Sequence, residues 1–219
     1  MGAESFPGSP AQRLGWTAAL AVAFAYVEAA VVAYLRALYY PEGFAFPVKP
    51  IDPTHLGIEL GREAATIVML GSVAMLGGRR AAERFGIFAV AFGLWDLFYY
   101  VWLKLLLDWP ASLTDWDLLF LIPAPWSAPV VAPCAVALLL TLGGALIVLD
   151  RGRRFRPGAL SWIAALGGTA ATLYSFLEQA GAIARGDPPR SYRYGLLAVG
   201  LVLYLVAFAR AWRPGEDEG

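Results

Sequence analysis

The chain alternates between long apolar stretches and short polar links. Each apolar stretch has about 20 residues, enough for a helix to cross a hydrocarbon core of about 30 Å. The stretches are continuous and do not alternate with period two, which favours helices over a transmembrane β-barrel. We therefore predict an all-α polytopic transmembrane bundle of about six spans. They lie near residues 14–40, 54–77, 85–107, 130–149, 160–183 and 194–212.

A proline-rich segment interrupts this pattern between the third and fourth spans. It runs from Asp115 to Pro129 and contains Pro123 and Pro125, and Pro133 follows just inside the next span. Irregular backbone at membrane depth is tolerated only where protein or a water-filled cavity covers it. We expect a short helix or re-entrant segment that folds over the outer mouth of the bundle.

The charges of the links predict the orientation. Arginines cluster in the links at 78–84 and 150–156, which lie on the same side of a six-span bundle. The positive-inside rule makes that side cytoplasmic. Both termini are then cytoplasmic, and the cytoplasmic (inner) membrane of a bacterium is the expected location. Residues 1–13 read as a flexible tail, 14–212 as the transmembrane domain and 213–219 as an acidic tail.

Composition agrees with this class. Hydrophobic residues make up 59% of the 219 residues, against roughly 45–50% apolar residues in soluble domains. The formal net charge is zero, so the chain lacks the basic field that nucleic-acid binding needs. The expected partners are instead the lipid bilayer and a small apolar or lipid-like molecule or an ion, with a homodimer or a membrane-complex partner as further options.

Polar residues in the second span share one helix face. His55, Glu59, Arg62, Glu63 and Thr66 fall at i, i+4, i+7, i+8 and i+11, and this spacing follows the helical period. Ionisable side chains within a span face the protein interior and mark functional sites by default. This face is therefore predicted to point into the bundle.

The first and third spans carry acids at about the same depth in the membrane as Glu63. At about 1.5 Å per residue, Glu63 lies roughly 15 Å from the outer end of its helix, and Glu28 and Asp96 lie roughly 18 Å from theirs. We expect these acids and Glu59 to converge on one outer-facing site as its catalytic groups. The expected substrate-binding residues are Arg36, Arg62, Tyr99, Tyr100, Trp126 and Glu178.

These acids and the two arginines form a column of charged side chains in the outer half of the bundle. Two interpretations of this column stay open. In one, Arg36 and Arg62 form structural ion pairs with the acids. In the other, the column lines a cavity open to the outer side. The acids outnumber the two arginines, which indicates that at least one carboxyl is protonated or binds a cation.

Three kinds of function fit such a site. His55, Glu59 and Glu63 could hold a divalent metal (Fe, Mn or Zn), although a lone histidine at a helix start is more often a cap. A protonated glutamate in a dry cavity suits acid–base catalysis on an apolar substrate. Chains of intramembrane acids also serve proton- or ion-coupled transport. A non-catalytic subunit of a larger membrane complex is the remaining alternative.

Two local resemblances to known proteins bear on the layout and the function. Ile58–Thr66 (IELGREAAT) and Trp116–Trp126 (WDLLFLIPAPW) resemble segments of small bacterial membrane proteins without an assigned activity, which implies the same six-span layout. His55–Glu59 (HLGIE) resembles the His-x-x-x-Glu helix of the sterol-isomerase family, and Leu173–Glu178 (LYSFLE) resembles another helix there. The Asp96–Pro133 region has no counterpart in that family, so its function is not transferred.

Overall fold

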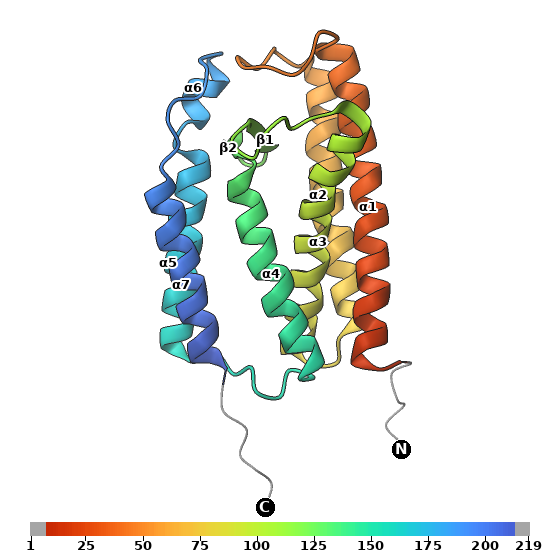
Figure 1. The fold of residues 1–219 in the computed structure, drawn as a ribbon, viewed down its shortest axis with the longest axis vertical. Coiled ribbons are helices and arrows are strands. Elements are labelled where there is room, and N and C mark those ends of the chain that lie inside the picture. The colour runs from red at the N-terminus through yellow and green to blue at the C-terminus, as the bar shows by residue number, and fades with distance from the viewer. Residues whose placement is uncertain (1–7, 213–219) are drawn as a thin grey trace, which may run out of the picture.

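The computed structural model describes residues 8–212 and confirms the all-α polytopic bundle. Six helical segments are long and apolar enough to cross a membrane (Figure 1). The helices are α1 (Pro10–Tyr39), α2 (Pro53–Gly77), α3 (Ala81–Leu107), α4 (Val131–Leu149), α5 (Ala159–Leu177), the short α6 (Ala180–Ala184) and α7 (Tyr194–Ala211). The tail at 213–219 and the first seven residues lie outside the described residues.

Helix starts differ slightly from the predicted ones because capping residues decide them. Helix α1 begins at Pro10, where the Ser9 and Gln12 side chains form a reciprocal capping box; the sequence pattern placed this start at Leu14. In α2 the N-cap is Asp52, whose carboxylate accepts from the Thr54 backbone N–H at 2.9 Å. Proline in the first turn suits both starts, because its missing N–H has no intrahelical partner there.

Helix α3 lies at the centre of a group of four helices, in which it contacts α1, α2 and α4. Its closest approach is to α4, where a Cβ on Gly144 would lie 2.5 Å from the Gly86 carbonyl oxygen. Only glycine permits this separation of the backbones, as in other tightly packed membrane helices. Helices α5 and α7 pack mainly against each other. The bundle therefore consists of a four-helix group and a two-helix group.

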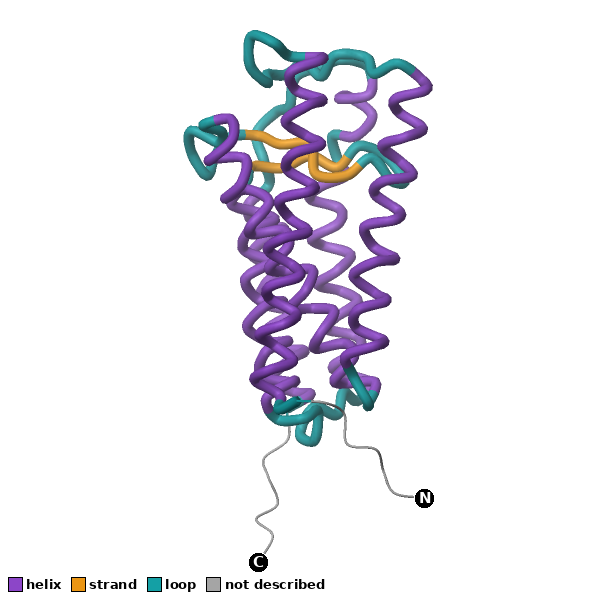
Figure 2. Tube along the Cα trace, turned by 90° about the vertical axis from the view of Figure 1, so that its right-hand side faces the viewer, coloured by secondary structure: helices purple, strands orange, loops and turns teal. Residues whose placement is uncertain are grey.

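The proline-rich segment is a β-hairpin. Strands β1 (Trp116–Phe120) and β2 (Trp126–Pro129) pair antiparallel, with Trp116 opposite Pro129 and Asp117 opposite Ala128. The alternative of a short helix is wrong, because prolines remove backbone donors and disfavour the helical conformation of the residues before them. The hairpin lies among the helices near one end of the bundle (Figure 2).

The two ends of the bundle differ in composition. The hairpin and α6 lie at one end, which we call the hairpin end (Figure 1). The start of α1, the end of α7 and the links around residues 78–80 and 150–158 lie at the other, which we call the link end. The arginine-rich links are therefore at the end away from the hairpin.

Candidate functional site

A cavity of about 120 Å³ lies where β1 meets α1, α2 and α3. It contains five carboxylates and two guanidinium groups among aromatic and aliphatic side chains. Its ionisable and aromatic lining residues are Glu28, Arg36, Tyr39, Tyr40, Phe44, Glu59, Arg62, Glu63, Trp95, Asp96, Tyr99, Tyr100, Asp117 and Phe120. The four predicted catalytic acids thus share one cavity, together with Arg36, Arg62 and both predicted tyrosines.

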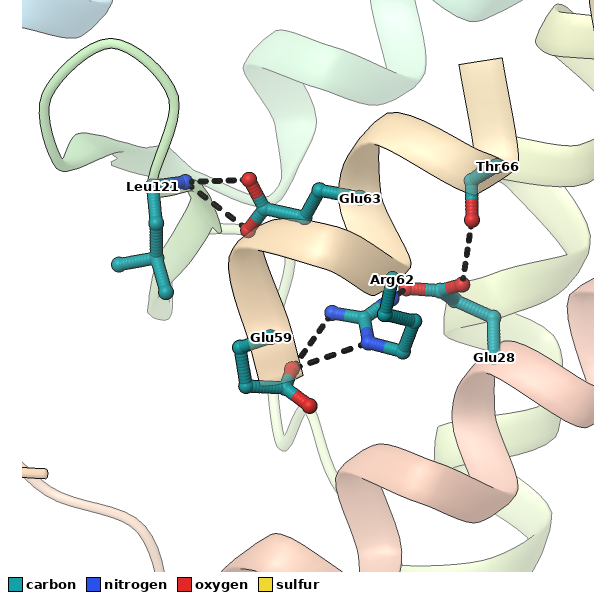
Figure 3. Close-up of polar contacts among 6 residues, drawn as sticks. All are labelled: Glu28, Glu59, Arg62, Glu63, Thr66 and Leu121. Atoms are coloured by element: carbon teal, nitrogen blue, oxygen red, sulfur yellow. Dashed lines mark hydrogen bonds and ion pairs between the residues drawn. The ribbon is translucent and has the colours of Figure 1, made fainter. Parts of the chain in front are cut away.

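Arg62 binds two of these acids. Its Nε and Nη2 donate to Oε2 of Glu59 at 2.9 and 2.8 Å, and its Nη1 forms an ion pair with Glu28 (Figure 3). The Thr66 hydroxyl donates to the other oxygen of Glu28 at 3.3 Å. Glu59, Arg62 and Thr66 reach one place because they share a face of α2. The arrangement fixes one positive charge between two carboxylates.

Glu63 points to the hairpin instead of to an arginine. Both of its carboxylate oxygens accept from the backbone N–H of Leu121, at 2.9 and 3.0 Å (Figure 3). Leu121 follows the last residue of β1 and precedes a proline-containing turn. An N–H there has no partner in the β-ladder, and the carboxylate supplies one. Glu63 therefore connects α2 to the hairpin.

Arg36 forms a second charged group with the hairpin. Its Nη2 lies 3.2 Å from Oδ1 of Asp117, and the Tyr100 hydroxyl donates to Oδ2 at 3.2 Å. The guanidinium also lies over the rings of Phe44 and Trp109, at 4.4 and 3.8 Å from their centroids. Burial raises the pKa of Asp117 to about 6, although Arg36 and Tyr100 act in the opposite direction. Asp117 is only 2% exposed.

Asp96 lies in the same cavity without such a partner. Within residues 8–212 its carboxyl makes no hydrogen bond or ion pair, whereas Glu28, Glu59 and Asp117 each face an arginine. With Glu63, it is one of two cavity acids that lack a cationic neighbour in direct contact. Five carboxyl groups in one cavity with two arginines repel one another when ionised.

The metal interpretation finds no geometric support. His55 is not part of the cavity lining; its Nδ1 shares a 2.6 Å hydrogen bond with the Tyr39 hydroxyl. In the described part of the chain, no group of three or more His, Cys, Asp or Glu side chains is arranged to hold a metal ion. The three predicted ligands instead have separate partners: His55 bonds Tyr39, Glu59 pairs with Arg62, and Glu63 accepts from Leu121.

Two residues predicted to bind substrate lie elsewhere. Glu178, at the end of α5, pairs with Arg193 at 2.7 Å. The Trp126 ring packs between Phe120 and Phe176, with centroids 5.6 and 6.3 Å away. Neither lines the cavity. Trp126 belongs to the contact between the hairpin and α5, and Glu178 to the pairing of α5 with α7. The hydropathy pattern does not reveal that this two-helix group lies apart from α1–α3.

Asp117 is the main site residue that the sequence pattern did not predict. The order of residues along the chain predicts Asp117 at the outer end of the bundle, above Glu28, Glu63 and Asp96, and does not single it out as a site residue. Its burial depends on the hairpin register, which puts Asp117 opposite Ala128 and turns it toward Arg36. The signal in the sequence was an acid flanked by Trp116 and Leu118, since an acid in an apolar strand needs a buried partner.

Comparison of the chain with family models, with characterised proteins and with solved structures gives no match. The two resemblances noted in the sequence therefore carry no activity to this chain.

Proposed function

We propose that this membrane protein uses the cavity as an acid–base site that acts on a small, largely apolar molecule. The observation that carries the proposal is the imbalance of five carboxylates against two arginines in one cavity. Such a site keeps protons at neutral pH, which is the condition for a carboxyl to act as an acid there. The aromatic and aliphatic lining supplies the contact surface for an apolar substrate.

The contacts of the five carboxyl groups suggest different roles for them. Glu28 and Glu59 share Arg62 as their cationic partner. Asp96 and Glu63 have no arginine in contact and are the proton carriers of this proposal. One protonated and one ionised carboxyl in the same cavity can give a proton to a substrate and remove another.

The orientation is part of the proposal. The arginine-rich links at the link end favour a cytoplasmic location for that end. The cavity at the hairpin end then faces the outer side of a bacterial cytoplasmic membrane. A substrate would reach it from outside or from the outer leaflet, past the β-hairpin.

Proton- or ion-coupled transport is the second candidate, because intramembrane carboxylates also serve proton relays. The apolar core between the cavity and the link end argues against a continuous path for protons or ions across the bundle. Its buried cluster there consists of Ala74, Ile87 and Val148, and Ala21, Ala25 and Leu70 lie between it and the cavity. A relay would need polar groups or water at that depth.

Two measurements test the proposal. Infrared spectroscopy at neutral pH should show a protonated carboxyl band that Asp96→Asn reduces. In sealed vesicles, an imposed proton gradient should dissipate equally with wild-type protein and with Asp96→Asn. A steady proton flux that only the wild type supports would assign the site to transport.

A further inference from the structure

Among the described residues that line the cavity, two hydrogen-bond donors are buried with neither a hydrogen-bond acceptor nor an ion-pair partner, whereas Arg62 Nη1 lies against the Glu28 carboxylate. The two donors are Nη1 of Arg36 and Nε1 of Trp95, in side chains that are 8% and 4% exposed. Buried donors are nearly always paired, because an unmet one costs free energy. Two unmet donors around one cavity therefore indicate a ligand that supplies acceptor atoms.

The charges of the cavity lining restrict the charge that a ligand can carry. An anion would meet five carboxyl groups, and both arginines already have carboxylate partners. A metal cation supplies no acceptor for these donors, and an ammonium cation would bring further N–H donors to them. A neutral molecule with an accepting oxygen satisfies the donors without adding charge.

The size of the cavity sets a second limit. An apolar cavity of about 150 Å³ in another protein holds one benzene molecule. This cavity has about 120 Å³, so it accepts a group of about that size or slightly smaller. Trp95, Tyr99 and Phe120 contribute ring surface to its walls.

We propose that the cavity binds a neutral, carbonyl-type oxygen compound of about the size of one six-membered ring, with the oxygen accepting from Trp95 Nε1. This inference rests on the proposed function, because the carboxyls that stay protonated act as neutral donors toward the same oxygen.

Trp126 provides a matched control within the chain. Its Nε1 is also buried without an acceptor, but Trp126 does not line the cavity. Replacing either tryptophan by phenylalanine removes one indole N–H and keeps an aromatic ring. A difference between the two variants therefore reports the cavity and not a general effect of losing a tryptophan.

The experiment uses the full chain in lipid nanodiscs and four probes: cyclohexanone, cyclohexane, cyclohexylammonium and cyclohexanecarboxylate. Binding is measured by saturation-transfer NMR, with empty nanodiscs subtracted to remove partitioning into lipid. We expect cyclohexanone to bind most tightly. Trp95→Phe should weaken its binding roughly two- to tenfold, as for the loss of one net hydrogen bond, and Trp126→Phe should leave it unchanged.

Three outcomes would overturn the inference. They are equal binding of cyclohexanone and cyclohexane, tightest binding of either charged probe, and equal effects of the two tryptophan variants. The infrared test separates this failure from failure of the proposed function. A carboxyl band that depends on Asp96 without cyclohexanone binding leaves the acid–base site in place and removes only the substrate class.

Discussion

Glu63 on α2 holds the hairpin through the backbone N–H of Leu121, which lies 58 residues further along the chain. The same carboxylate lines the cavity. It therefore combines a structural contact with a place in the candidate site. Substitutions at this position can separate the two roles.

The first prediction separates the two roles of Glu63 by substitutions that differ in size and charge. Glu63→Gln keeps a carbonyl oxygen that can accept from Leu121 N–H, so the stability of the protein should change by less than about 1 kcal/mol. Glu63→Ala leaves the N–H unpaired and should cost about 1–3 kcal/mol. Thermal unfolding in detergent measures both, and equal losses for the two variants would show that charge, not hydrogen bonding, holds the hairpin.

The second prediction concerns Arg62. Arg62→Gln leaves Glu28 and Glu59 facing each other without their shared cation, which should destabilise the protein by about 3–5 kcal/mol. Arg193→Gln is the control, because Arg193 is 64% exposed in its pair with Glu178 and exposed pairs contribute less than about 1 kcal/mol.

Adding Glu28→Gln to Arg62→Gln should restore part of the loss, since it removes one uncompensated charge. Denaturant unfolding of the single and double variants supplies the comparison. No recovery in the double variant would mean that Arg62 acts through packing and not through charge.

The third prediction is a pH dependence. The pKa of Asp117 in the folded protein is about 6, raised from 3.8 mainly by burial. A raised pKa means that the folded state binds the proton more tightly, so this contribution to stability is complete below about pH 4 and is lost as pH rises through 6. Asp117→Asn should remove that part of the decline in melting temperature between these values.

Asp115 serves as the control for this measurement. Burial would raise its pKa slightly, but hydrogen bonds from Ser112 and Ala111 outweigh it and hold the pKa below the usual value. Its contribution is therefore present above pH 4 and is lost only as pH falls further. If Asp115→Asn and Asp117→Asn alter the profile in the same window, the assignment to Asp117 is wrong.

The fourth prediction is topological. Reporter fusions after Arg80 and Arg154 should be cytoplasmic, and a fusion after Lys49 should be external, because the arginine-rich links stay on the cytoplasmic side. Alkaline phosphatase and fluorescent-protein fusions give opposite signals on the two sides. An inverted pattern would place the cavity at the cytoplasmic face and remove the proposed route of substrate entry.

The helices and most of the cavity follow from the sequence for a clear physical reason. Apolar length marks the spans, and the helical period places Glu59, Arg62 and Glu63 on one face of α2 whatever their neighbours are. Depth then brings Glu28 and Asp96 to a similar level. These are local properties of single helices, so a sequence pattern is sufficient to predict them.

The hairpin and its contacts do not follow in the same way. The prolines indicate an interruption but do not distinguish a broken helix from a strand pair. Asp117 reaches Arg36 only through the strand register, and Glu178 turns to Arg193 because α5 packs with α7 and away from the cavity. Such contacts depend on tertiary arrangement, which hydropathy and spacing leave undetermined.

Infrared spectroscopy of the carboxyl groups tests the central claim most directly. Wild-type protein at neutral pH should show a protonated carboxyl band that shifts in D₂O. Asp96→Asn should reduce the band, and Asp108→Asn should not, because the Asp108 side chain is 90% exposed. Absence of the band in the wild type, or equal spectra for the two variants, would contradict a proton-holding site at Asp96.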